Sequence, residues 1–136
     1  MKEYLEKLKA PGQTVNPLFG FLGVKVEEIA KERAVLRLPL REEFRQGAGV
    51  IAGGIMAALA DEAMAHVILA NLEPGQTTAT LEMNLRYLKP IKQGELIAEA
   101  RMVKKGRKVV VVSARVLDQE QNELALAGAS FIISRL

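Results

Sequence analysis

The sequence lacks cysteine and tryptophan altogether, and it contains a single histidine, His66. Without cysteine there is neither a disulfide framework nor a thiol nucleophile. One histidine is too few for a multi-histidine metal site, and it disfavours a Ser-His-Asp triad. The composition therefore predicts no metal centre.

Aromatic residues are scarce at 4%, and 19 basic residues against 16 acidic ones give a net charge of only +3. Nucleic-acid-binding proteins usually concentrate basic residues on one helix or stripe and often interleave them with aromatics. Here the lysines and arginines are scattered along the chain, so we do not expect nucleic-acid binding. The mild positive bias suits a phosphate-bearing small molecule at least as well.

Long apolar runs without charge are also absent. The N-terminal segment MKEYLEKLKA lacks the apolar core of a signal peptide, and we expect a cytoplasmic protein. The most apolar stretch, residues 50–72, carries Asp61 and Glu62 in its middle, which argues against a membrane span. The chain length predicts one domain, residues 1–136, with a helical extension at residues 1–15.

Hydrophobic periodicity predicts two strands, one long helix and then four strands. The strands are expected at residues 24–27, 33–40, 77–88, 95–103, 107–117 and 124–133, and the helix at residues 53–70. The helix is apolar nearly all round, which indicates that it is buried. We predict an α+β fold in which a curved antiparallel sheet wraps around this central helix. Exposed edge strands favour dimerisation through the sheet edges.

Two glycines, Gly53 and Gly54, stand at the start of the predicted helix. Amide N–H groups in a first helical turn lack intrahelical partners, and together with the helix dipole they stabilise negative charge on a carbonyl oxygen. Missing side chains also allow a substrate to approach closely. The alternative is that both glycines only relieve packing between helix and sheet, and spacing alone does not decide between the two.

Asp61 lies two turns further along the same predicted helix, within an alanine-rich run. A buried carboxylate without a partner is energetically costly, so it needs either a partner or a chemical task. The task would be to attack a carbonyl carbon or to activate the water that does so. The alternative is a carboxylate satisfied across a dimer interface.

Glu62 and His66 are four residues apart and therefore share a helical face. We interpret this pair as a local salt bridge or an interface contact rather than a catalytic dyad. Glu62 points about 100° away from Asp61 on an ideal helix, so the two carboxylates are not expected to share a site.

Basic residues gather at one predicted hairpin tip, KKGRK, which contains Gly106 and Arg107. Lys89 precedes Pro90 at the end of another predicted strand. Such tips are suited to binding phosphates through point charges and guanidinium forks. The alternative is an ordinary solvated turn.

The stretch QGAGVIAGGIMAALAD, residues 46–61, resembles the signature of the PaaI-like hotdog-fold thioesterases, the group named for phenylacetate degradation. That signature runs Asn-x-x-Gly-x-x-His-Gly-Gly and continues into an apolar helix with an acid nine residues after the His. The similarity covers roughly residues 16–134. The matching positions are Gly49, Gly53, Gly54 and Asp61.

The resemblance implies an acyl-CoA thioesterase that forms a dimer or tetramer, with each active site at a subunit interface. The Gly53 amide would polarise the thioester carbonyl, and Asp61 of the other subunit would act as nucleophile or general base. No cofactor is implied, because CoA is part of the substrate, and the basic turn would meet its phosphates. The implied binding positions are Gly49, Gly54, Lys89, Gly106 and Arg107.

Two positions depart from the signature: Ala52 stands where the family has histidine, and Gln46 where it has asparagine. In relatives these two side chains help to orient the thioester and the water. Alanine does neither, whereas Gln46 keeps an amide with a longer reach and remains a candidate catalytic residue. We therefore retain a second hypothesis, a hotdog protein that binds acyl-CoA with little or no turnover. A hotdog dehydratase would need a catalytic histidine, and His66 lies on the wrong side of Asp61 for that role.

Overall fold

The computed structural model describes all of residues 1–136 and contains the predicted order of two strands, a long helix and four strands. The helices are α1 (Lys2–Leu8), α2 (Pro17–Leu22) and α3 (Gly53–Leu69), with a short 3-10 helix η1 (Glu42–Phe44). The strands are β1 (Lys25–Ile29), β2 (Arg33–Pro39), β3 (Gln76–Tyr87), β4 (Glu95–Lys105), β5 (Val109–Leu117) and β6 (Glu123–Arg135). None of the helices combines the length and the hydropathy that a membrane span requires.

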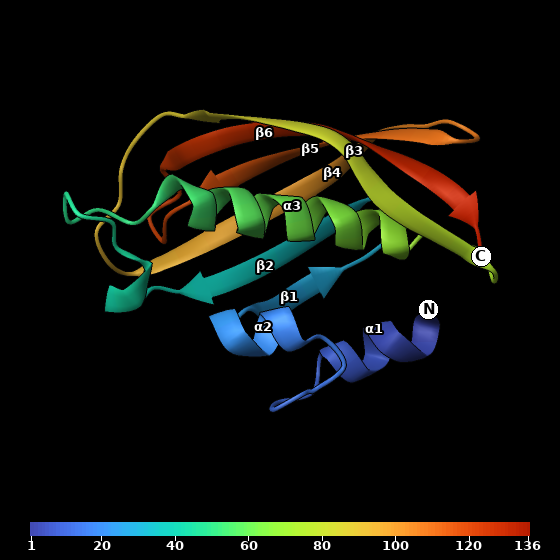
Figure 1. Ribbon diagram of the computed structural model, residues 1–136, viewed down its shortest axis with the longest axis horizontal. Helices are drawn as coiled ribbons and strands as arrows, with labels where there is room; N and C mark the ends of the chain where they lie inside the picture. Colours follow the sequence, from blue (N-terminus) through green and yellow to red (C-terminus); the bar gives the residue numbers. More distant parts are fainter.

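The six strands form one antiparallel sheet in the order β1-β2-β4-β5-β6-β3. The chain leaves β2, runs through α3 across the sheet and enters β3 at the opposite edge, while β4 returns to pair with β2. In Figure 1 the sheet curves around α3, and α1 and α2 lie beside β1. This is the predicted hotdog arrangement, and it leaves β1 and β3 as the two edge strands.

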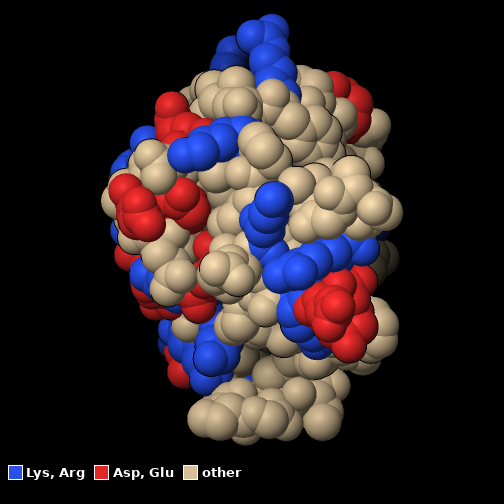
Figure 2. Space-filling view, turned by 90° about the vertical axis from the view of Figure 1, so that its left-hand side faces the viewer, with Lys and Arg blue, Asp and Glu red and all other residues tan.

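Charged side chains of both signs are mixed over the surface. On the outer face of the sheet, Glu99 lies 3.0 Å from Arg33 and 3.2 Å from Arg115. At the end of the molecule that carries the start of α3, Figure 2 shows lysines and arginines interspersed with acidic and uncharged residues. The structure thus has no basic stripe at this end, in keeping with the scattered charge of the sequence.

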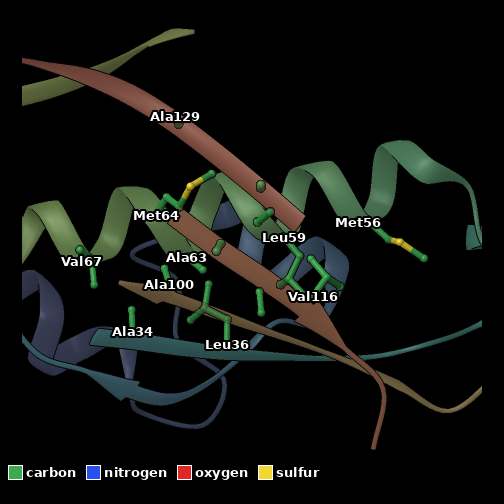
Figure 3. Packing of buried hydrophobic residues seen from close by; sticks show 14 of the residues in the cluster. Ala34, Leu36, Met56, Leu59, Ala63, Met64, Val67, Ala100, Val116 and Ala129 are labelled. Carbon is green, nitrogen blue, oxygen red and sulfur yellow. The ribbon is translucent and has the colours of Figure 1, made fainter. Parts of the chain in front are cut away.

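The hydrophobic core lies between the concave face of the sheet and one side of α3 (Figure 3). The residues of α3 that are buried there are Met56, Leu59, Ala60, Ala63, Met64, Val67 and Ile68. Facing them are small and branched side chains from the strands, such as Leu36, Ala100 and Val116. The helix packs close to the strands because the small alanine side chains on the helix and on the sheet take up little space between them.

The opposite side of α3 is only partly covered. Its half-exposed residues are Ala57, Ala58, Asp61, Glu62 and Ala65. The prediction of a helix buried all round is therefore correct for the side that faces the sheet and wrong, within a single chain, for the other. Hydropathy identifies a helix face that avoids water, but it does not distinguish a core from an uncovered surface.

The cluster of apolar residues after Asn16 folds into the helix α2, which the periodicity did not predict. The Asn16 side chain caps α2 by accepting a hydrogen bond from the amide of Phe19 at 3.1 Å, and Pro17 occupies the first turn. Gly23 ends the helix with a left-handed φ of 87°. Six residues are too few to display a helical period, so only these two end signals were available.

The N-terminal segment is attached to α3 through a buried chain of polar groups. The Tyr4 hydroxyl lies 2.9 Å from Nε2 of His66, and it accepts a hydrogen bond from the Asn16 side-chain amide at 2.9 Å. Nδ1 of His66 lies 2.7 Å from the main-chain carbonyl of Glu62. Because a carbonyl only accepts, Nδ1 carries the proton and Nε2 accepts from Tyr4.

Of the two interpretations of the Glu62 and His66 pair, the local salt bridge is therefore wrong, whereas an interface contact stays a prediction. The imidazole bonds the main chain of Glu62 and leaves its carboxylate without an ion-pair partner. His66 is 2% exposed, and this burial lowers its pKa. Burial, reinforced by the charge of Asp61, raises the pKa of Glu62. The shift at His66 arises because Tyr4 and Phe19 of the N-terminal segment pack against the imidazole.

We predict that His66 contributes a fall in the free energy of unfolding as the pH drops below about 6.5, the ordinary pKa of histidine. Because the pKa of His66 is lower in the folded state, the unfolded chain binds a proton at a pH where the folded chain does not, so acid favours unfolding. For one proton, the free energy of unfolding changes by at most about 1.4 kcal/mol per pH unit. Urea unfolding between about pH 8 and about pH 5.5 measures this pH dependence in the original chain and in His66→Gln. The raised pKa of Glu62 has the opposite effect, but it acts in both chains, so the difference between them isolates His66. Equal pH dependences would show that His66 contributes nothing.

Candidate active site

Three segments meet at the beginning of α3: the loop of residues 45–52, the first helical turn, and the end of β3. The loop is attached to the body of the protein because the amide of Ala52 donates to the carbonyl of Phe44 and that of Ile51 to Ile91, both at 2.8 Å. Ala52 is the N-cap residue and provides no side-chain cap. The helix then begins at Gly53, as predicted.

The amide N–H groups of Gly53 and Gly54 point out of the first turn of α3. Neither takes part in a hydrogen bond to the main chain outside the helix or to a side chain. They precede the residues whose amides reach a carbonyl one turn back, so they also lack an intrahelical partner. At the positive end of a 17-residue helix, these donors favour a negatively charged oxygen.

Tyr87, at the end of β3, is a site residue that sequence reasoning missed. Its hydroxyl donates a hydrogen bond to the carbonyl oxygen of Gly53 at 2.8 Å. A side chain at Gly53 would collide with this ring, since a Cβ there would lie 2.8–2.9 Å from it. A Cβ at Gly54 would meet nothing within 4 Å. The contact joins positions 34 residues apart, and no local pattern reports it.

The loop ahead of α3 contains the predicted positions Gln46 and Gly49. Gly49 has a φ of +90°, and its amide donates to the carbonyl of Gln46 at 2.9 Å. The side-chain oxygen of Gln46 accepts a hydrogen bond from the amide of Ala48. The side-chain NH2 group of Gln46 has no partner within the chain and is exposed, so it is available as a donor to a ligand.

Asp61 lies on the uncovered side of α3. The hydroxyl of Thr80, on the neighbouring β3, donates a hydrogen bond to its Oδ1 at 3.0 Å. No basic side chain pairs with it; the ion pairs of the structure involve other residues. The carboxylate is half-exposed rather than fully buried, because the chain covers this side of the helix only in part. One oxygen is held by Thr80 while the other is free for chemistry.

A single chain does not bring Asp61 and the Gly53 amide together. The two residues are eight positions apart on one helix, which corresponds to about 12 Å along its axis. A carbonyl held by the amide and a carboxylate that attacks it must place the reacting atoms within about 3–3.5 Å. Asp61 and Gly54 are seven positions apart, or about two turns, and therefore lie on the same side of α3.

The predicted phosphate-binding positions lie at opposite ends of β3. Lys89 follows Tyr87 closely, at the end where α3 begins. Gly106 and Arg107 form the turn between β4 and β5, at the end where β3 starts. There Arg107 lines a cavity of about 720 Å³ with other polar and basic residues, namely Gln76, Lys108, Ser134 and Arg135. The 12 residues of β3 separate the two ends by about 36 Å, so one chain does not unite them.

The backbone of this turn requires glycine at position 106. The amide of Gly106 donates to the carbonyl of Val109 at 3.0 Å, and a Cβ at this glycine would lie 2.5 Å from that oxygen. As a consequence β5 begins at Val109, two residues later than predicted. The tight turn presents Lys105 and Arg107 at the tip.

Comparison with known proteins places the chain in a family. The model of the thioesterase superfamily matches residues 48–125, more than half of the chain. The chain is 35% identical over 129 residues to a candidate esterase of Halobacterium salinarum, covering 87% of this chain and 85% of that protein. It is 23% identical over 114 residues to the 1,4-dihydroxy-2-naphthoyl-CoA hydrolase of Listeria monocytogenes, covering 84% of this chain and 93% of that protein.

The solved structures agree with the sequence relatives. A candidate thioesterase from Ralstonia eutropha, related to phenylacetic acid degradation, superposes with a TM-score of 0.84 at 26% identity, covering 95% of this chain and 98% of that one. The matched family region contains α3, β3, β4 and β5, which carry most of the candidate site. The chain therefore belongs to the thioesterase superfamily, and it is a PaaI-like hotdog-fold thioester hydrolase.

Proposed function

We propose that the protein hydrolyses the thioester bond of an acyl-CoA or aryl-acyl-CoA to the free acid and CoA, at a site shared by two copies of the chain. One observation carries the proposal. The uncovered side of α3 holds free amide donors at its start and a carboxylate two turns later, about 12 Å away. Both are suited to acyl transfer, and neither reaches the other within one chain.

In the proposed reaction the thioester carbonyl oxygen accepts a hydrogen bond from the Gly53 amide. Negative charge grows on this oxygen as the carbon becomes tetrahedral, and the fixed donor and helix dipole stabilise it. Asp61 either attacks the carbonyl carbon or takes a proton from the water that does so. The carbon–sulfur bond then breaks, and CoA leaves as a thiolate that is protonated. If water attacked, its oxygen is now part of the free acid. If Asp61 attacked, the acyl–aspartyl anhydride that has formed is hydrolysed by water to the free acid and the Asp61 carboxylate.

Gln46 is proposed to contribute a second donor through its side-chain NH2 group, in place of the asparagine of the family signature. This group has no hydrogen-bond partner within the chain, because the interaction with the Ala48 amide uses only the side-chain oxygen of Gln46.

Two copies of the chain are proposed to pair through β3, an edge strand of 12 residues. Antiparallel pairing of this edge around a two-fold axis would run the two α3 helices in opposite directions. Asp61 of one copy would then approach Gly53 of the other across the small residues Ala57 and Ala58. The same axis would bring the basic turn at Arg107 of the partner to the Gly53 end, where it would meet CoA phosphates.

A second candidate function is acyl-CoA binding with little or no turnover. Ala52 supports it, because this N-cap position offers no side chain to orient a thioester or a water. In that case acyl-CoA would raise the melting temperature without being cleaved, since a ligand that binds only the native state stabilises it. Free CoA release from a panel of acyl-CoA thioesters decides between the two functions.

We predict that Asp61→Asn lowers kcat by at least about 100-fold, because the amide neither attacks the carbonyl nor accepts a proton from water. The matched control is Glu62→Gln, which removes the neighbouring carboxylate that points about 100° away. It should keep kcat within about twofold of the original value. Thiol release from acyl-CoA, followed with a chromogenic reagent, measures both. Full activity in Asp61→Asn would remove Asp61 from the mechanism.

We also predict that Thr80→Val lowers kcat by about tenfold while KM changes little, because the hydroxyl that holds Oδ1 of Asp61 is lost. Thr77→Val is the control, as Thr77 lies on the same strand without a side-chain hydrogen bond to the acid. Steady-state kinetics on one acyl-CoA tests the pair of variants. Equal kcat values for the two would show that Thr80 does not position the carboxylate.

A further inference from the structure

The ring of Tyr87 fills the space where a side chain of Gly53 would be. A Cβ on that glycine would lie 2.8 Å from Cζ and 2.9 Å from both Cε1 and the hydroxyl oxygen. The hydroxyl bond to the Gly53 carbonyl, 2.8 Å long, fixes the orientation of the ring. Tyr87 is nevertheless 56% exposed, so much of the ring faces open space.

This geometry gives the two glycines at the start of α3 different roles. The missing side chain of Gly53 makes room for Tyr87, not for a substrate. At Gly54 the corresponding space is empty, because a Cβ on that residue would have no neighbouring atom within 4 Å. A ligand that approaches the free amides of the first turn therefore has open space over Gly54 and an aromatic wall beside Gly53.

We propose that Tyr87 is a specificity-determining residue whose ring forms one wall of the acyl pocket. The inference rests on the proposed function, because it takes the Gly53 amide as the donor to the thioester carbonyl. The acyl α-carbon is bonded directly to that carbonyl carbon, so the acyl group begins within a few ångströms of the ring. A flat ring held at one angle accepts planar aryl and unbranched acyl groups and excludes branching at the α-carbon.

The hydroxyl bond has a separate effect. It holds the carbonyl of the peptide group whose N–H belongs to Gly54, and so it keeps the first turn of α3 and its donors in one orientation. Loss of the hydroxyl alone should therefore slow turnover for every substrate alike. Loss of the whole ring should instead change the order of preference among substrates. The two substitutions separate the two effects.

The test compares Tyr87→Ala and Tyr87→Phe on phenylacetyl-CoA, hexanoyl-CoA and the branched pivaloyl-CoA. Tyr87→Ala should raise the ratio of kcat/KM for pivaloyl-CoA to that for phenylacetyl-CoA by at least about tenfold. Tyr87→Phe should lower kcat by about threefold on all three and leave the ratio unchanged. The control Phe21→Ala removes a ring that is 72% exposed on α2 and should change neither quantity.

The substitution Gly53→Ala gives a second measurement. Its Cβ should displace the ring in the original chain and cost more activity there than in the Tyr87→Ala background, where the space is vacant. Equal losses in both backgrounds would mean that the substrate, and not Tyr87, requires the glycine. An unchanged acyl ratio in a folded Tyr87→Ala protein would likewise overturn the proposal.

If the original chain cleaves none of the thioesters, the proposed function fails, but the role of Tyr87 as a wall of the acyl pocket can still be tested through binding. The rise in melting temperature with each acyl-CoA then replaces turnover as the readout. A change in the rank order of these rises in Tyr87→Ala supports the wall. The same rank order in both proteins, or no rise with any acyl-CoA, contradicts it.

Discussion

The whole arrangement depends on the sheet covering only one side of α3. Six strands curve around the helix and bury its inward residues, while the outward side, with Ala57, Ala58 and Asp61, is left half-exposed. A carboxylate sealed in the sheet-facing core would be costly, whereas on the outward side it keeps access to a substrate and needs only the Thr80 hydroxyl. The same exposure leaves apolar surface that a second copy of the chain would cover.

The positions of the functional groups along α3 then determine how a complete site can be formed. Free amides mark its beginning and the acid stands two turns later, so a site that uses both needs two helices running in opposite directions. The basic turn at Arg107 lies at the far end of β3 from Gly53, and the same pairing would bring these two ends together. A single symmetry axis would thus join three groups that one chain keeps apart.

Local patterns were sufficient to predict the elements that repeat over many residues. The strands and α3 were expected close to their observed bounds because alternation and helix-forming residues persist over 9 or more positions in each long element. The beginning of α3 at Gly53 and the tight turn at Gly106 followed from glycine placement. The helix α2 escaped prediction because six residues show no period.

Contacts between distant positions could not be predicted from such patterns. Tyr87 meets Gly53 across 34 residues and Tyr4 meets His66 across 62, and in both cases the partner is chosen by the fold. Helical spacing suggested a local salt bridge or an interface contact for Glu62 and His66, yet one imidazole nitrogen bonds the main chain and the other bonds Tyr4. Spacing states which side chains share a face, but the groups packed on that face decide what they bond.

The central claim is that Asp61 of one chain acts with Gly53 of its partner, and mixed dimers test it most directly. Asp61→Asn removes the acid, and Gly53→Pro removes the amide and also displaces the Tyr87 ring, so it disables the amide side of the site as a whole. Each variant alone should be inactive, whereas co-expressed chains that pair at random should regain about a quarter of the original activity, because one site in four combines an intact acid with an intact amide. A mixed preparation, shown to contain both chains in one dimer, that is no more active than either variant alone would contradict the account.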